Sequence, residues 1–536
     1  MAKKIYYEAE AREKVLSGAK QLYDAVKVTF GPKGQNVIIE KDYGAPVITH
    51  DGVTVAEAVD LPSDKETMGE AVGAKLIKTA AQKLNKVAGD GTTTVTVLTY
   101  NILSEANKLI AAGVNPMELR RGIEKAGAEI VAQIDKMSEK IEGNSKKVAE
   151  VATISAGDAQ IGELIAKVIS KIGKDGVVTV EAGQGLEMED EIVEGFTYDK
   201  GYASAFFITD VNRQEAVFDK PLILVTDKKI SSANEILPLL EKCAQAGKKE
   251  LVIIAEEVEG EALSLLVLNK LKGVFNSLVL KAPSFGDRRK EIMEDIAILT
   301  DATVVSADKG LKLEEVGMEV LGSCGKVIAA KDETTIIKGA GVKAEVEARI
   351  ELIRNLAENA KSDYEREEFE KRAAALSGKV AVIKVGGATE TEIDEKKFRV
   401  DDAVAATKAA LSEGIVPGGG VTLVNLATSL DATDDGARIV KNALKAPFTH
   451  IMENAGLNAQ ALLAQVESAK PGFGINVMAP EKGLIEMKKA GVIDPAKVTK
   501  EAVKNATSIA ATAITMGALI SEIPEEKSAA PAPEMY

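Results

Sequence analysis

The stretch Gly89-Asp90-Gly91-Thr92-Thr93-Thr94 separates a helical pattern at roughly 73–87 from an apolar run that begins at Val95. Its glycines let the backbone approach a ligand closely, because no Cβ stands in the way. Its threonines come where the next helix should start, and a helix N-terminus offers unpaired N–H groups and a positive dipole end to an anion. A carboxylate belongs among such groups if a divalent cation bridges it to phosphate oxygens. The stretch predicts a nucleotide–Mg²⁺ site; a simple helix cap and turn is an equally weighted alternative.

Composition argues against several other kinds of site. The chain of 536 residues has 67 Lys and Arg against 82 Asp and Glu, and this formal charge of −15 disfavours a nucleic-acid partner. With two cysteines and two histidines, a structural zinc site or a Ser-His-Asp triad is disfavoured. We expect a cytoplasmic protein without a membrane segment, because cysteines are few, no apolar run is long enough to span a bilayer, and the N-terminus lacks the apolar core of a secretory signal.

The predicted elements change in character along the chain. Amphipathic helical patterns dominate up to about Lys140 and again in the last quarter, whereas strand patterns such as VVTVEAG, PLILVTD and LVIIAEE alternate with helices in between. Ser232 and Glu235 form a capping-box signature at the start of one of these middle helices. Because the two ends resemble each other, we predict one helical domain built from both termini and a mixed α/β middle. The tail from about Ser528 is rich in Ala and Pro and is predicted to be disordered.

Two features of the middle segment are more apolar than one core requires. The helix predicted at 261–271 carries leucine and valine almost all round its axis, so either both faces are buried or one is presented to a partner. Just upstream, five aromatic residues fall within twelve positions: Phe196, Tyr198, Tyr202, Phe206 and Phe207. A core role is the favoured interpretation, and an exposed patch that adheres to unfolded chains is the alternative.

Two further acidic positions are ambiguous from the residues alone. Asp51, in His50-Asp51-Gly52, follows a short strand, where turn chemistry is the favoured interpretation. Asp402 lies in a helical pattern, where a solvated face is favoured. The triplet 418–420 is Gly-Gly-Gly, which is entropically unfavourable unless a ligand or close packing requires it.

Eight motifs along the chain together resemble a group I chaperonin of the bacterial 60-kDa type: FGPKG, AGDGTTT, KISSANEILPLL, AEEVEGEAL, KAPSFGDRRK, VAVIKVGGATE, GIVPGGG and GVIDPAKVT. The resemblance runs from about Lys3 to Pro524. It implies a multidomain fold with an all-α equatorial ATP-binding domain (1–139 and 413–526), an α+β intermediate hinge domain (140–193 and 381–412) and an α/β apical domain (194–380), followed by a disordered tail (527–536).

The resemblance also implies an activity. An ATP-hydrolysing chaperone would capture non-native polypeptides on an apolar apical rim, enclose them under a small co-chaperonin and promote their folding. The homo-oligomer would consist of two stacked seven-membered rings. The implied cofactors are ATP and Mg²⁺, and K⁺ is allowed as a further cation. Neither nucleic acid nor a membrane is expected as a partner.

Roles for individual residues follow from the same resemblance. Asp402 matches the carboxylate that positions or activates the attacking water, Asp51 a second one near the γ-phosphate, and Asp90 the magnesium ligand. The nucleotide contacts would be Thr29, Phe30, Gly31, Pro32, His50, Asp90, Gly91, Thr92, Thr93, Thr94, Gly419, Asn476, Val477, Met478 and Asp494. The contacts to client and co-chaperonin would be Tyr202, Phe206, Phe207, Leu237, Leu240, Leu263, Val267 and Leu268.

The chain departs from the family pattern in four places, and two other functional classes stay open. His50 stands where lysine is common, about four extra residues lie between Val59 and Gly73, Ser412 replaces an acidic or amide residue, and the Gly-Gly-Met tail is absent. A metabolic kinase would need a specific acceptor and no apolar rim. A passive adhesive assembly would have no ATPase, and the presence of Asp51, Asp90 and Asp402 in their motifs argues against it.

Overall fold

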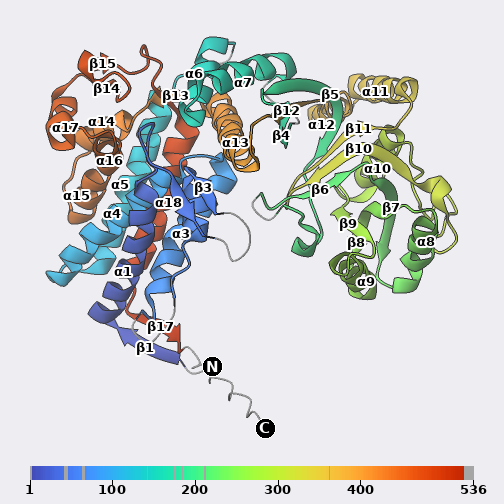
Figure 1. Cartoon of the computed structure of the whole chain (residues 1–536), viewed down its shortest axis with the longest axis horizontal. Helices are drawn as coiled ribbons and strands as arrows, with labels where there is room; N and C mark the ends of the chain where they lie inside the picture. Colours follow the sequence, from blue (N-terminus) through green and yellow to red (C-terminus); the bar gives the residue numbers. More distant parts are fainter. Residues whose placement is uncertain are drawn as a thin grey trace, which may run out of the picture. The chain divides into compact units, whose positions relative to one another are not determined.

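The computed structural model describes residues 3–40, 46–62, 67–141, 143–173, 176–183, 185–210, 213–360 and 362–523. The chain forms two compact units, the first made of Met1–Lys174, Val180–Glu189 and Lys384–Tyr536, the second of Asp175–Thr179 and Asp190–Ile383 (Figure 1). The predicted tail at 527–536 and residues 63–66 of the extra segment lie outside the described residues. Among the described helices, none is long and apolar enough to cross a membrane.

The first unit is mainly helical, and its core joins the two ends of the chain. Helix α4 (Thr92–Ala111) packs against α18 (Ala496–Ala513), and α18 packs against α5 (Pro116–Met137). Close approach needs small residues: a Cβ on Gly127 of α5 would lie 2.6 Å from Thr507 Oγ1 of α18. The strands β1 (Lys3–Tyr7) and β17 (Ala518–Glu522) pair antiparallel, so the first and last described strands lie side by side.

The remaining elements of this unit surround that core. The helices are α1 (Glu8–Lys27), α2 (Gly52–Ala58), α3 (Glu70–Ala88), α6 (Ser145–Ala156), α7 (Ala159–Ile172), α13 (Glu390–Glu413), α14 (Val421–Ser429), α15 (Asp435–Ala443), α16 (Ala446–Asn454), α17 (Ala459–Ser468) and the short η3 (Pro480–Lys482). Short antiparallel pairs are formed by β2 (Val37–Ile39) with β3 (Val47–Thr49), β13 (Ile415–Pro417) with β16 (Ile493–Pro495), and β14 (Phe473–Ile475) with β15 (Leu484–Glu486).

Helix α13 begins earlier than the sequence pattern predicts. The pattern indicates a start near Lys396, but the helix starts at Glu390, because the Thr389 side chain accepts a hydrogen bond from Glu392 N (3.2 Å) and caps it. The longer helix contacts α6, β3 and β16. Asp402 therefore lies on a helix that touches both the strand before Asp51 and the strand that holds Asp494.

The second unit consists of a β-sheet with parallel and antiparallel strand pairs, together with helices. Its strands follow the order β4-β12-β5-β11-β10-β7-β8-β9, with β6 paired to β10. Strands β7, β8 and β9 are parallel and are joined through α8 and α9 (Figure 1). The strands are β4 (Val177–Ala182), β5 (Glu189–Tyr198), β6 (Ala216–Asp219), β7 (Leu222–Ile230), β8 (Glu250–Val258), β9 (Asn276–Lys281), β10 (Gly322–Ala329), β11 (Thr334–Gly339) and β12 (Lys379–Val385). The helices are η1 (Ala205–Phe207), α8 (Ala233–Gln245), α9 (Gly260–Leu271), α10 (Gly286–Thr300), η2 (Met318–Val320), α11 (Lys343–Glu358) and α12 (Asp363–Leu376).

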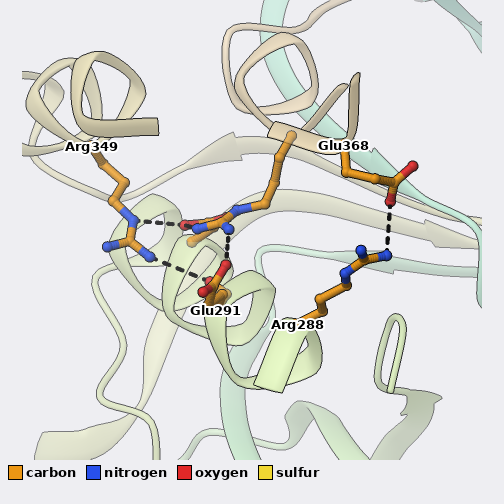
Figure 2. Close-up of polar contacts among 6 residues, drawn as sticks. Arg288, Glu291, Arg349 and Glu368 are labelled. Atoms are coloured by element: carbon orange, nitrogen blue, oxygen red, sulfur yellow. Dashed lines mark hydrogen bonds and ion pairs between the residues drawn. The ribbon is translucent and has the colours of Figure 1, made fainter. Parts of the chain in front are cut away.

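Ion pairs fasten the hairpin of α11 and α12 to α10 (Figure 2). Asp295 of α10 is fully buried and accepts hydrogen bonds from Arg349 Nε (2.7 Å) and Arg372 Nη2 (3.2 Å). Arg372 also pairs with Glu291, and Arg288 lies 3.6 Å from Glu368. Two guanidinium groups on one buried carboxylate compensate its lost hydration, so the hairpin is held on this side by charge as well as by packing.

Candidate functional site

The glycines around Asp90 are required by the backbone. Gly89 and Gly91 have φ of 67° and 84°, in the left-handed region that favours glycine. A Cβ on Gly89 would lie 2.2 Å from Ala405 Cβ of α13, and one on Gly91 would lie 2.5 Å from Val498 Cγ1 of α18. Within the described chain, no side-chain hydrogen bond caps α4, so Asp90 does not serve as its cap. The first N–H groups of α4 therefore stay available to an anion.

Asp51 has a clear structural role at the turn before α2. Its carboxylate caps the helix by accepting from Val53 N (3.0 Å), Thr54 N (2.8 Å) and Thr54 Oγ1 (2.6 Å). The same turn lies against the start of α4, because a Cβ on Gly52 would be 2.3 Å from Thr93 Oγ1. Asp51 therefore caps a helix and does not lie in the tight Asp-Gly turn that the sequence predicts, and this position places it beside the first threonines of α4.

Asp90 interacts electrostatically with Asp51, Asp402 and Asp494, and Asp51 also interacts with Asp402. Burial first, and then the charges of Asp51 and Asp90, raise the pKa of Asp402 well above its usual value. Burial, together with the charge of Asp51, also raises the pKa of Asp90. Burial and the charge of Asp90 raise the pKa of Asp494 to about 7. Each of these carboxyl groups is surrounded by protein but keeps some solvent-accessible surface.

This group of four, Asp51, Asp90, Asp402 and Asp494, is called the acidic recess below. In the described part of the chain, none of the four forms an ion pair with Lys or Arg. Nor do the described side chains include a cluster of three or more His, Cys, Asp or Glu that could enclose a metal ion. A cation in the recess would therefore take ligands from outside the protein, as Mg²⁺ does when it binds one or two carboxylates together with water and phosphate oxygens.

Ser155 contacts Asp90, although no pattern in the sequence points to this serine. Its Oγ, on α6, donates to Asp90 Oδ2 at 2.9 Å, while the other Asp90 oxygen accepts from Gly91 N. The hydroxyl group fixes the orientation of the Asp90 carboxylate. A serine near the end of a helix, 65 residues away along the chain, has no local signature that would reveal this role.

Three glycines and a strand pair form the wall that holds Asp494. Asp494 on β16 pairs with Val416 on β13. A Cβ on Gly418 would lie 2.8 Å from Asp494 Oδ1, and one on Gly420 (φ 77°) would lie 2.8 Å from Phe448 Cα. Close packing is therefore one reason for the glycine triplet. Gly419 (φ 66°) has more room, with the nearest atom, Met487 Cε, 3.1 Å from a built Cβ.

The other predicted nucleotide residues lie in two loops of the first unit. Thr29, Phe30, Gly31 and Pro32 follow α1, and Asn454 of α16 holds their loop by donating to Phe30 O at 3.0 Å. Asn476, Val477 and Met478 follow β14, where Asn476 Oδ1 accepts from Met478 N at 3.0 Å. Val477 is buried in a core cluster that Phe30 also contacts, whereas Met478 is 61% exposed. Both loops thus border one small apolar core.

His50 is mostly enclosed, and its pKa is lowered. Burial is the main cause of the lowered pKa, and the positive charge of Arg399 on α13 also lowers it. The negative charges of Glu395 and Asp51 raise the pKa but do not outweigh burial. The imidazole is therefore neutral at neutral pH, so it does not supply the positive side-chain charge that a lysine would bring.

The predicted client residues in the second unit differ in exposure. Phe206, Leu268 and Leu237 are 64%, 53% and 37% exposed, and Leu271 and Val274, at and just after the end of α9, are 65% and 58% exposed. Leu263 and Val267 are partly buried. By contrast, Tyr202, Phe207 and Leu240 belong to the core. The five aromatics thus divide: four are core, as favoured, and Phe206 alone is exposed. The apolar helix α9 presents one side outward.

Comparison with known families identifies the family of the chain. Residues 22–524 match the model of the TCP-1/cpn60 chaperonin family. The chain therefore belongs to this family of protein-folding chaperones, which are nucleotide-dependent ATPases, act on substrate polypeptides and assemble as rings.

Proposed function

We propose that this chaperonin is a group I member of the bacterial type, and that it hydrolyses ATP with Mg²⁺, and with K⁺ as a further cation, to fold captured non-native polypeptides. The acidic recess beside the uncapped start of α4 is the observation that carries the proposal. Carboxylates without a cationic partner repel a free anion. They become compatible with a triphosphate when a cation enters with it.

In this proposal the four carboxylates have different tasks. Asp90, oriented by Ser155, would hold Mg²⁺, whose charge would offset that of the phosphate oxygens. Asp402 orients the attacking water and accepts its proton, for which a raised pKa is favourable. Asp51, fixed by its hydrogen bonds to Thr54, stays near the terminal phosphate. Asp494 accepts from the ribose.

The domain plan and assembly are part of the same proposal. Residues 1–139 and 413–526 would form the equatorial domain, 140–193 and 381–412 the hinge, and 194–380 the apical domain. Asp402 belongs to the hinge segment, so hydrolysis would depend on the position of that segment. Two stacked seven-membered rings, a small co-chaperonin lid and a cytoplasmic location complete the assignment.

Client capture is assigned to the exposed apolar surface of the second unit. Phe206, Leu237 and Leu268 offer apolar contacts that do not depend on the sequence of the client, so they could bind many different unfolded chains. Leu237→Glu should abolish capture of a denatured protein and leave ATP hydrolysis intact. Unchanged capture in this variant would show that the surface has been assigned wrongly.

Asp402→Ala is the decisive test of the ATPase assignment. The variant should bind ATP with near-normal affinity but hydrolyse it at least about 100-fold more slowly, since a positioned base contributes a factor of about 10²–10⁴ to a rate. Asp394→Ala is the matched control, because Asp394 lies on the same helix, is exposed and is 3.9 Å from Lys397. Light scattering should find both variants in rings. Normal turnover in Asp402→Ala would remove Asp402 from its role.

A further inference from the structure

Lys270, near the end of α9, turns its ammonium group into the protein. Its Nζ donates a hydrogen bond to the backbone oxygen of Phe207. It also lies 5.7 Å from the centre of the Phe207 ring and 5.6 Å from that of Phe218. Both rings are buried. A cation near the faces of desolvated aromatic rings is attracted by their quadrupoles.

The lysine completes the hydrogen bonding of the short turn η1. Inside the turn, Phe207 N donates to Ser204 O and Ile208 N to Ala205 O, both at 3.1 Å. The Phe207 oxygen comes at the end of the turn and receives its hydrogen bond from Lys270. Without an ammonium donor, this acceptor would be left unpaired in a buried position, which is unfavourable.

The two adjacent phenyl rings of the turn differ in exposure. Phe206 is 64% exposed, whereas Phe207 is 0% exposed. A release of the turn would let the two neighbours exchange places or lose a fixed orientation. Because an ordered contact residue loses less entropy on binding, a fixed Phe206 favours client capture.

No anionic partner competes for this lysine among the described residues. The charged side chains on the elements around it include Glu261 on α9, Lys281 on β9 and Asp219 on β6, and Asp219 pairs with Lys326 at 3.2 Å. Burial alone lowers the pKa of Lys270 to about 8, and none of these charges shifts it. The cation is thus held by a carbonyl oxygen and two rings.

We propose that Lys270 is a positioning residue for client capture, which clamps the oxygen and ring of Phe207 and thereby holds Phe206 outward. This inference rests on the proposed chaperone function of the surface around Phe206. It predicts that a positive charge at position 270, and not only a side chain of similar length, sustains capture.

The absence of tryptophan from the chain provides a direct probe. Phe206→Trp introduces a single fluorophore on the turn, and Lys270→Met, Lys270→Arg and Lys272→Met are compared in that background. Lys270→Met should lower the tryptophan anisotropy and weaken capture of a denatured protein about tenfold, as expected for the loss of a charge-assisted hydrogen bond. Lys270→Arg should retain both properties. Lys272→Met, at an exposed position in the same helix end, should change neither.

A pH series separates the clamp from a merely structural role. Between pH 7 and 9.5, capture and anisotropy should fall in the Phe206→Trp parent and stay constant in its Lys270→Arg derivative, since guanidinium remains charged. Unchanged anisotropy and capture in Lys270→Met, or equal losses in the Met and Arg variants, would overturn the proposal. The anisotropy arm needs no client, so it decides on the clamp by itself, whereas failure of the wild-type chain to capture a denatured protein would contradict the proposed function instead.

Discussion

Replacing Asp494 by asparagine should stabilise the protein when nucleotide and metal are absent. The folded-state pKa of this carboxyl group is about 7, raised from 3.8. The folded protein therefore holds the proton more tightly than the unfolded chain, and the free energy of unfolding falls as pH rises from about 4 to 7 and is level above. Asparagine keeps the size of the side chain and does not titrate, so it removes this loss.

The magnitude follows from the shift. A change of 3.2 units, from 3.8 to about 7, corresponds to about 4 kcal/mol at 1.36 kcal/mol per unit. The carboxyl group keeps some solvent contact, and a discount by half gives about 2 kcal/mol as the lower end. With an unfolding entropy of about 2.1 cal/mol/K per residue, the chain of 536 residues should show a melting temperature about 2–4 °C higher at pH 8. At pH 5 the increase in melting temperature should be less than half of that at pH 8, because most of the stability loss caused by Asp494 occurs between pH 5 and 7.

Scanning calorimetry with a chelator present, at a fixed scan rate, would measure these differences. Asp431→Asn is the matched control, since it removes the same charge from an exposed position and should leave the melting temperature unchanged. ATP should stabilise the Asp494→Asn variant less than the wild type, because the neutral amide accepts more weakly from a ribose hydroxyl. An equal or lower melting temperature for Asp494→Asn at pH 8 would refute the electrostatic account of the recess.

Three further results are expected. Asp295→Asn leaves Arg349 and Arg372 without their buried counter-charge and should cost about 3–5 kcal/mol in urea unfolding; a loss below about 1 kcal/mol would show that the pairs contribute little. Gly89→Ala places a Cβ 2.2 Å from Ala405 Cβ at a φ of 67°, so it should cost about 1–3 kcal/mol of stability and slow ATP hydrolysis, and normal stability would contradict the packing. Mg²⁺ should bind more tightly at pH 8 than at pH 6 in calorimetric titration, because protons compete for the raised carboxyl groups; affinity independent of pH would count against the recess as a cation site.

Local signals in the sequence identified individual elements well. The capping box of Ser232 and Glu235 is present as predicted because both partners lie within one helical turn. The Asp-Gly pair after a strand indicated a turn at Asp51, but helix α2 begins at Gly52 and Asp51 caps it. The proximity of Asp90 and Asp494 rests on the packing of α4, α18 and the β13–β16 pair, which join distant parts of the chain. Only the family resemblance, and no periodicity, indicated that they belong together.

Other features could not have been read from the residues. Phe206 and Phe207 are identical neighbours, and the choice of the exposed ring depends on a turn whose last carbonyl oxygen is held by Lys270, 63 residues away. A similar argument applies to Ser155, whose hydroxyl group acquires its role only from the tertiary position of α6. The sequence shows where apolar residues are in excess and where acidic motifs lie. Tertiary contacts determine which aromatic residue is exposed and which serine contacts Asp90.

Ionisation of the acidic recess opposes folding, and a cation bound there would offset this cost. Three of its carboxyl groups have raised pKa values, because their mutual repulsion and poor hydration oppose full ionisation. In the proposed function, binding of a cation would remove this opposition and release protons, so that cation affinity and protonation are coupled. The helix that carries Asp402 also contacts the elements around Asp51 and Asp494. A change of charge in the recess therefore acts directly on α13, and that helix is the element through which we expect nucleotide binding to be communicated.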